Sequence, residues 1–300
     1  MSMNSTQPSE GVPGVPPLPP GRFVELAGRG TTFVRESGSR NGGPSVVLLH
    51  GLAATASLNW YCAFPALERD YHVIALDHRG HGRGIRDSRA FTLHDAADDV
   101  VALADALDIE HCIAVGYSMG GPIAQLMWRR HRERVSGLVL CATSHTFRAH
   151  LYERAMFAAL PALEHVTRIV PDVVSAEVIA RLAARYLATC DYGEWAQSEL
   201  RLRDQRAVLQ AASALGTHSA HRWIGDVDVP TSVLVHARDQ LVSPARQHAL
   251  AARITGATTH VVDADHFAPV RRPSVFTSAL VRALDDVAKP PAPAQLRWAS

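Results

Sequence analysis

The chain has little cysteine and almost no net charge. Its 300 residues include four cysteines, and no two of them form a C-x-x-C pair: Cys62, Cys112, Cys141 and Cys190. This spacing argues against zinc and thiol-redox motifs and favours a reducing, cytoplasmic location, although a disulfide between distant cysteines stays open. Lysine and arginine number 30 against 29 aspartate and glutamate, a formal charge of +1. That balance argues against nucleic-acid binding and against a polybasic membrane anchor.

Long apolar runs and a secretion signal are also missing. No run of 18 apolar residues occurs, so we expect no transmembrane helix and no stable membrane insertion. Residues 1–20 are rich in Pro, Gly and Ser and lack the apolar segment of a signal peptide, so we expect a disordered tail. Residues 289–300 are expected to form a second flexible tail. Metal-ligand spacings, a dinucleotide fingerprint and a P-loop are absent, so we expect no metal and no cofactor.

Apolar runs that end in polar, glycine-rich turns recur between about residues 45 and 143. These runs are PSVVLLHG (44–51), YHVIALDHRGHG (71–82), HCIAVGYS (111–118) and VSGLVLCAT (135–143). Continuous apolar runs of this length are typical of strands buried on both faces. Helical periodicity separates them, for example over residues 91–107. The alternation predicts an α/β fold with a mostly parallel central sheet flanked by helices.

Strand patterns also occur before and after this region. RFVELAGRGTTFVRES (22–37) is typical of two short strands around a glycine turn, a hairpin. Strand-and-turn patterns return at residues 228–244 and 257–270. A final helix is expected over residues 273–287.

Residues 145–225 interrupt the alternation. They are rich in Ala, Leu and Arg, have helical periodicity and contain no strand-like run. Helices are expected at 148–166, 175–190 and 198–215. We interpret 145–225 as an inserted helical cap, a lid over the strand ends, and residues 21–144 with 226–288 as the core.

The pentapeptide Gly116-Tyr117-Ser118-Met119-Gly120 fits the pattern G-x-S-x-G. It follows a predicted buried strand and precedes a helical run, the context in which this pattern forms a sharp turn that exposes a nucleophilic serine. The alternative is a glycine-rich packing turn with an idle serine. Because the turn would place Ser118 at a helix N-terminus, we favour the nucleophile.

A serine nucleophile needs a base, and the base needs an acid that orients it. Since ligand sites of parallel sheets lie beyond the carboxyl ends of the strands, only turns that follow strands qualify. Asp239 and His266 each follow a predicted strand, so we expect a Ser118–His266–Asp239 triad. The rival acids and bases, which we interpret as structural, are Asp263, Asp265, His50, His78, His81 and His260.

Two backbone N–H groups should stabilise the oxyanion that forms during acyl transfer. The residue after the nucleophile, Met119, supplies the first. The turn after the first long parallel strand supplies the second, and we choose Leu52.

These motifs together resemble the α/β-hydrolase superfamily, and within it the capped esterase- and lipase-like branch. The segments that carry the resemblance are HGLAAT (50–55), DHRGHGRG (77–84), GYSMGG (116–121), Asp239 with Pro244, and His266 with Pro273. The resemblance implies the fold, the Ser…Asp…His chain order and a structural role for the DHRGHG turn. Three positions depart from the family's usual pattern: His236 and Asp265 stand where glycine is common, and Arg271 stands where an acidic residue is common.

The expected activity is cleavage of a carboxylic ester through an acyl-enzyme. The expected partner is a small, apolar, neutral ester, because no arginine cluster awaits a carboxylate or phosphate. Thioesterase, lactonase, carbon–carbon bond hydrolase and cofactor-free perhydrolase activities stay open, because each uses the same triad. A non-catalytic binding protein on the same fold and a homodimer also stay open.

Overall fold

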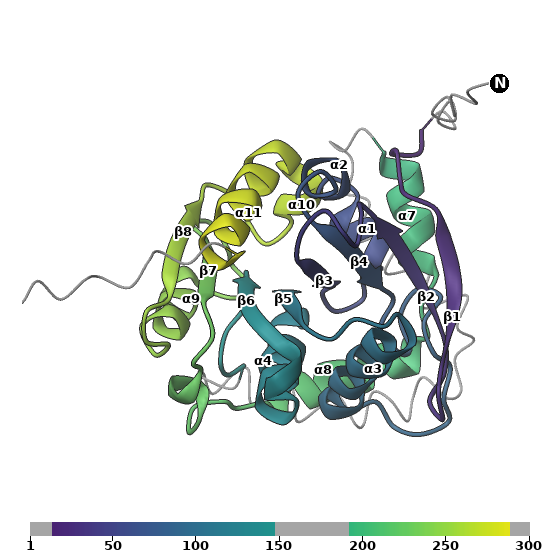
Figure 1. Ribbon diagram of the computed structural model, residues 1–300, viewed down its shortest axis with the longest axis horizontal. Coiled ribbons are helices and arrows are strands. Elements are labelled where there is room, and N and C mark those ends of the chain that lie inside the picture. The colour runs from purple at the N-terminus through teal and green to yellow at the C-terminus, as the bar shows by residue number, and fades with distance from the viewer. Residues whose placement is uncertain (1–13, 148–191, 289–300) are drawn as a thin grey trace, which may run out of the picture.

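The computed structural model describes residues 14–147 and 192–288, and within them an eight-stranded sheet forms the centre (Figure 1). The strands are β1 (Gly21–Leu26), β2 (Gly30–Ser37), β3 (Ser45–Leu49), β4 (His72–Leu76), β5 (Cys112–Tyr117), β6 (Val135–Cys141), β7 (Thr231–His236) and β8 (Thr258–Val262). Their order across the sheet is β1-β2-β4-β3-β5-β6-β7-β8. β2 pairs antiparallel with β1 and β4, and all later pairings are parallel. The predicted α/β fold class is confirmed.

Helices cover both faces of the sheet, as Figure 1 shows. The helices are α1 (Ala56–Trp60), α2 (Phe64–Leu67), α3 (Leu93–Ala106), α4 (Gly120–Arg130), α7 (Gly193–Arg201), α8 (Gln205–Thr217), α9 (Pro244–Ala251), α10 (Ala268–Arg271) and α11 (Pro273–Ala288), with short 3-10 turns at Arg132–Arg134 and Ile224–Asp226. Within β3, Val47 and Leu49 pack in the cluster that includes α3 and α4. Val46 and Leu48 pack in the opposite cluster, with α1, α2 and α11. Because successive side chains of a strand point to opposite faces, a strand buried on both faces must be apolar throughout.

The segment interpreted as a cap is described only at its ends. The helices expected at 148–166 and 175–190 lie outside the described residues. The single helix expected over 198–215 is wrong: α7 ends at Arg201 and α8 begins at Gln205. The Asp204 side chain causes the new start, because it accepts a hydrogen bond from the Ala207 N–H and caps α8.

The predicted N-terminal tail of residues 1–20 is described from residue 14 onward. Leu18 packs, partly buried, against the core, and Arg35 donates a hydrogen bond to the Pro19 carbonyl at 2.5 Å. Residues 289–300, the predicted C-terminal tail, lie outside the described residues. Among the helices that the structure describes, none is both long enough and apolar enough to cross a membrane.

Candidate active site

The turn between β5 and α4 holds Ser118 in a strained backbone conformation. Ser118 has φ of +52°, in the left-handed region that side chains rarely adopt. Its N–H donates to Cys141 O at 2.9 Å, and the Thr143 hydroxyl donates to Ser118 O at 2.7 Å. These two hydrogen bonds hold the strained residue in place. Strain of this kind is typical of functional sites.

The flanking glycines allow the turn to lie against the sheet. A Cβ atom on Gly116 would lie 2.3 Å from the Gly120 carbonyl oxygen. One on Gly120 would lie 2.1 Å from the Leu49 carbonyl oxygen, and one on Gly121 would lie 2.2 Å from the Thr143 hydroxyl. Because these contacts are with backbone or with buried groups, each position requires glycine.

Hydrogen bonds join Ser118, His266 and Asp239, which the sequence places 148 and 27 positions apart. His266 Nε2 lies 2.9 Å from Ser118 Oγ, and His266 Nδ1 lies 2.7 Å from Asp239 Oδ2. Since an ionised carboxylate only accepts, Nδ1 carries the ring proton, and Nε2 is free to accept the hydroxyl proton of Ser118. The structure therefore brings together the three predicted triad residues, each of which follows the carboxyl end of a parallel strand.

The Asp239 carboxylate is buried and held by several donors. Its Oδ1 accepts hydrogen bonds from the N–H groups of Leu241 at 2.8 Å and Val242 at 2.9 Å. Its Oδ2 accepts from Gln247 Nε2 at 3.1 Å as well as from His266. These donors fix the direction of the carboxylate, so that one oxygen faces the imidazole.

The two proposed oxyanion donors lie beside Ser118. Met119 is the residue between Ser118 and the start of α4, and Leu52 follows Gly51, whose Cβ position would lie 3.3 Å from Ser118 Cβ. The side chain of Asn59 holds this turn by accepting the Gly51 N–H at 3.0 Å. Within residues 14–147 and 192–288, neither the Leu52 nor the Met119 amide donates a hydrogen bond. Both N–H groups are therefore available to an anion.

The side chains of the turn after β4 have structural roles. The Asp77 carboxylate accepts the N–H groups of Ala56 at 2.7 Å and Arg83 at 2.8 Å, and burial raises the pKa of Asp77 to about 6. His50 Nε2 accepts the His78 N–H at 3.0 Å. Burial lowers the pKa of His78 to about 3 and, for the next histidine in the turn, of His81 to about 4.

The remaining rivals are engaged elsewhere. His260 lies 2.9 Å from the Asp286 carboxylate. Asp263 forms ion pairs with Arg238 and Arg272, and Asp265 forms one with Arg271. None of these side chains hydrogen-bonds to Ser118 Oγ, so among the described residues only His266 contacts the hydroxyl.

Three residues around the triad escaped the sequence analysis as functional candidates: Tyr117, His236 and Gln247. The Tyr117 hydroxyl donates to the His266 carbonyl, His236 Nδ1 contacts the Asp265 carbonyl, and Gln247 binds Asp239. His236 was visible only as a departure from the family pattern. Nothing in the sequence distinguished Gln247, because its role depends on a contact between α9 and the turn after β7.

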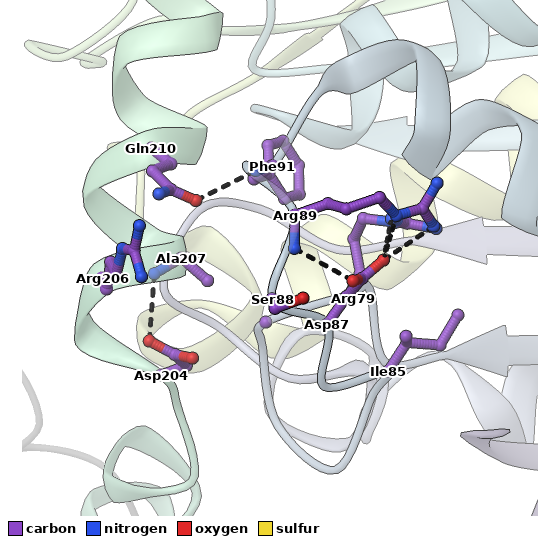
Figure 2. Close-up of a pocket in the computed structure, with 11 residues that line it drawn as sticks. Arg79, Ile85, Asp87, Ser88, Arg89, Phe91, Asp204, Arg206, Ala207 and Gln210 are labelled. Carbon is purple, nitrogen blue, oxygen red and sulfur yellow. Dashed lines mark hydrogen bonds and ion pairs between the residues drawn. The ribbon is translucent and has the colours of Figure 1, made fainter. Parts of the chain in front are cut away.

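Two surface hollows lie apart from the triad. One, of about 50 Å³, lies between α8 and the turn after β4 (Figure 2). Arg79 and Arg89 form ion pairs with Asp87, at 3.5 and 2.7 Å, so each guanidinium charge is matched by a carboxylate. Figure 2 shows the three side chains close together. The other, of about 370 Å³, lies between α3, α4 and the end of α8, with His218 and Trp223 in its wall. Neither includes a triad residue, and the described residues contain no group of three metal-ligating side chains.

Comparison with known proteins places this geometry among related chains. A family profile described as alpha/beta hydrolase fold matches residues 44–273. A protein of Mycobacterium phage D29, whose name assigns it to the non-heme haloperoxidases, is 30% identical over 253 residues, 82% of this chain and 89% of its own. The 2-hydroxymuconate semialdehyde hydrolase of Pseudomonas sp. CF600 is 37% identical over 127 residues, 41% of this chain and 44% of its own.

The fold also recurs in solved structures. The thermophilic esterase of Thermogutta terrifontis superimposes with a TM-score of 0.74 at 23% identity. The match covers 90% of this chain and 99% of the esterase. At this level of identity the match shows the shared fold.

Proposed function

This chain belongs to the alpha/beta hydrolase fold family, and we propose that it is a serine hydrolase that cleaves a carboxylic ester through an acyl-enzyme. The observation that carries the proposal is the hydrogen-bonded chain from Asp239 Oδ2 through His266 to Ser118 Oγ, with distances of 2.7 and 2.9 Å. A serine hydroxyl is a weak nucleophile until a base removes its proton. Here an imidazole with a free Nε2 lone pair lies in position to do so.

In the proposed reaction, Ser118 Oγ attacks the ester carbonyl carbon while its proton passes to His266 Nε2. The electron pair of the carbonyl moves onto oxygen, and the resulting anion accepts hydrogen bonds from the Leu52 and Met119 N–H groups. Asp239 stabilises the imidazolium and holds its tautomer. Collapse of the intermediate expels the alcohol, which takes the proton from Nε2 and leaves an acyl-enzyme on Ser118. A water molecule, deprotonated by His266, then attacks the acyl carbon in the same way, and the acid leaves as Ser118 regains its proton.

The surroundings of the triad support an apolar substrate. Leu241, two residues after Asp239, is 61% exposed, and Phe267, directly after His266, is 38% exposed. Large apolar side chains at the rim of a site favour apolar ligand groups. We further propose that residues 145–225 form a cap that shapes the acyl pocket, with α7 and α8 as its C-terminal part.

Two related reactions are alternatives, because relatives are named for them. The partial match to a protein named as a hydrolase of 2-hydroxymuconate semialdehyde, a compound without an ester bond, favours cleavage of a carbon–carbon bond, in which the same site would activate water or polarise a ketone. The match to a haloperoxidase-named protein favours perhydrolysis, in which hydrogen peroxide replaces water at the acyl-enzyme. Both alternative reactions would use Ser118 and His266.

The first test is labelling with a fluorophosphonate probe, which reacts with activated serines. The wild type should label, Ser118→Ala should not, and Ser136→Ala, a change of an exposed serine in β6, should label like the wild type. Hydrolysis of p-nitrophenyl esters of increasing chain length then measures the acyl pocket. A folded wild type that neither labels nor hydrolyses any ester would refute the acyl-enzyme and favour a non-catalytic binding role.

A further inference from the structure

His236 lies beneath the loop that carries His266. It ends β7, is fully buried, and its Nδ1 lies 3.0 Å from the Asp265 carbonyl oxygen. Because a carbonyl oxygen only accepts, Nδ1 carries the proton, and the buried Nε2 lone pair has no partner among the described residues. Burial lowers the pKa of His236 to about 4, so the ring is neutral at neutral pH. It therefore acts as a fixed donor to the residue directly before His266.

Tyr117 holds the next carbonyl of the same loop. Its hydroxyl donates to the His266 carbonyl oxygen at 2.8 Å. Tyr117 is the neighbour of Ser118, so this bond links the nucleophile's turn to the histidine's loop. His236 and Tyr117 pack edge to face at 5.6 Å between ring centroids, and Phe276 packs against both. The loop of His266 thus lies on a layer of buried rings.

Gln247 holds the acid in the same way. It lies in α9 and is fully buried. Its Nε2 donates to Asp239 Oδ2 at 3.1 Å and to the Val242 carbonyl at 2.6 Å, and its Oε1 accepts the His236 N–H at 2.9 Å. Both the NH₂ group and the oxygen of the Gln247 amide therefore form hydrogen bonds. The NH₂ group donates to the same carboxylate oxygen that accepts from His266 Nδ1.

We propose that Gln247 is a positioning residue that sets the direction and the charge distribution of Asp239 in the triad, with His236 as its partner beneath the His266 loop. This inference rests on the proposed function, because it assigns a role within that site. A donor on Oδ2 draws negative charge from the oxygen that faces the imidazole and prevents the carboxylate from rotating away. We expect removal of the Gln247 amide to lower activity by about 10- to 100-fold, the range known for residues that orient metal ligands.

The two roles open to Gln247 differ in what they alter. If Gln247 only stabilises the fold, its removal lowers the free energy of unfolding and leaves the pH profile in place. If it positions Asp239, its removal concentrates charge on Oδ2 and strengthens the attraction for the imidazolium of His266. The acid limb of the kcat/KM profile then moves to higher pH.

The test compares Gln247→Met with Gln125→Met on a p-nitrophenyl ester. Both variants remove a fully buried glutamine amide, but Gln125 lies in α4 and donates to the Ser144 carbonyl, away from the acid. We expect Gln247→Met to lower kcat by about 10- to 100-fold with KM near the wild-type value, and to move the acid limb to higher pH. Gln125→Met should have the wild-type kcat, and the acid limb of its pH profile should lie at the wild-type pH.

A second variant, Gln247→Leu, replaces the amide with an apolar side chain of different shape and likewise donates nothing to Asp239. It should also lose kcat, and it decides the matter if Gln247→Met does not fold, as judged by circular dichroism. A folded variant at Gln247 with wild-type kcat and an unmoved limb would overturn the inference, and so would an equal loss in Gln125→Met. A wild type that the fluorophosphonate probe does not label would defeat the proposed function itself, and this inference with it.

Discussion

The Glu199 carboxylate accepts a hydrogen bond from the Thr55 hydroxyl at 2.6 Å, across 144 positions of sequence. Glu199 lies in α7, and Thr55 is the N-cap of α1, directly after the turn that carries Leu52. Arg83 completes the contact with an ion pair to Glu199 at 2.8 Å. Helix α7, which lies near the C-terminal end of the predicted cap, is therefore attached to the turns beside the proposed oxyanion donors.

Removing this carboxylate should destabilise the protein. Glu199→Ala leaves the buried Thr55 hydroxyl and part of the Arg83 charge without a partner, so we expect a loss of about 1–3 kcal/mol in the free energy of unfolding. Urea unfolding followed by circular dichroism measures it. Glu194→Ala, a change of an exposed glutamate in the same helix, should have little effect, and equal losses in both variants would contradict the assignment.

Asp239→Asn should keep the fold and abolish most activity. The amide oxygen must face the Leu241 and Val242 N–H groups, which places the NH₂ group against His266 Nδ1. Nδ1 then has to accept, the proton moves to Nε2, and the ring can no longer take the Ser118 proton. We expect kcat to fall about 10⁴-fold. Asp263→Asn, with its carboxylate exposed, is the control and should retain wild-type kcat; substantial activity in Asp239→Asn would argue against the triad.

Gly120→Ala should be poorly tolerated. The new methyl would lie 2.1 Å from the Leu49 carbonyl oxygen, a backbone atom that cannot move without disturbing β3. We expect a cost of about 3 kcal/mol or more, the upper range for overpacking. Gly42→Ala meets its nearest atom at 3.3 Å and is the milder comparison. The midpoint of urea unfolding compares the stability of the two variants. Equal midpoints would show that the turn between β5 and α4 can shift to accommodate the methyl group.

Stability should fall steeply as the solution is acidified from about pH 6.5 to 4. Burial lowers the pKa of His78 to about 3 and of His81 and His236 to about 4, against about 6.5 for an unfolded imidazole. Between these pH values the histidines of the unfolded chain bind protons, while the buried histidines of the folded chain stay neutral. The stability present above pH 6.5 is therefore progressively lost as the pH falls. Asp77, with its pKa raised to about 6, acts in the opposite sense, but it is one group against several buried histidines, since burial also lowers the pKa of His145 and of His218 to about 4.

Melting temperatures between pH 7.5 and 4.5 test this expectation. His78→Phe provides the control, because both ring nitrogens of His78 are buried without a hydrogen-bond partner. The variant should lose less stability on acidification than the wild type, because one of the buried imidazoles with a lowered pKa is gone. A wild-type melting temperature that is independent of pH would show that these rings are hydrated in the folded protein.

Much of the site followed from local patterns. Ser118 was recognisable because a buried strand, two glycines and a helical run surround it within about ten residues. Asp239 and His266 were recognisable because the carboxyl ends of parallel strands meet at one edge of a sheet. His236 and Gln247 left no such signal, since any buried polar residue has the same appearance in sequence. The break at Asp204 was missed because the periodicity of α7 continues through it into α8.

The sequence by itself determined the order of strands and helices along the chain, the sharp turn at Ser118 and the chain order of the proposed triad. Apolar periodicity and the placement of glycine depend only on neighbouring residues, so both can be read from the sequence. Tertiary structure alone decided which of several acids and histidines meet. His260 and Asp265 carry the same functional groups as His266 and Asp239, but the fold brings them to Asp286 and Arg271 instead. A hydrogen bond needs its atoms within about 3 Å, and only the packing of the sheet brings residues 118, 239 and 266 to that distance.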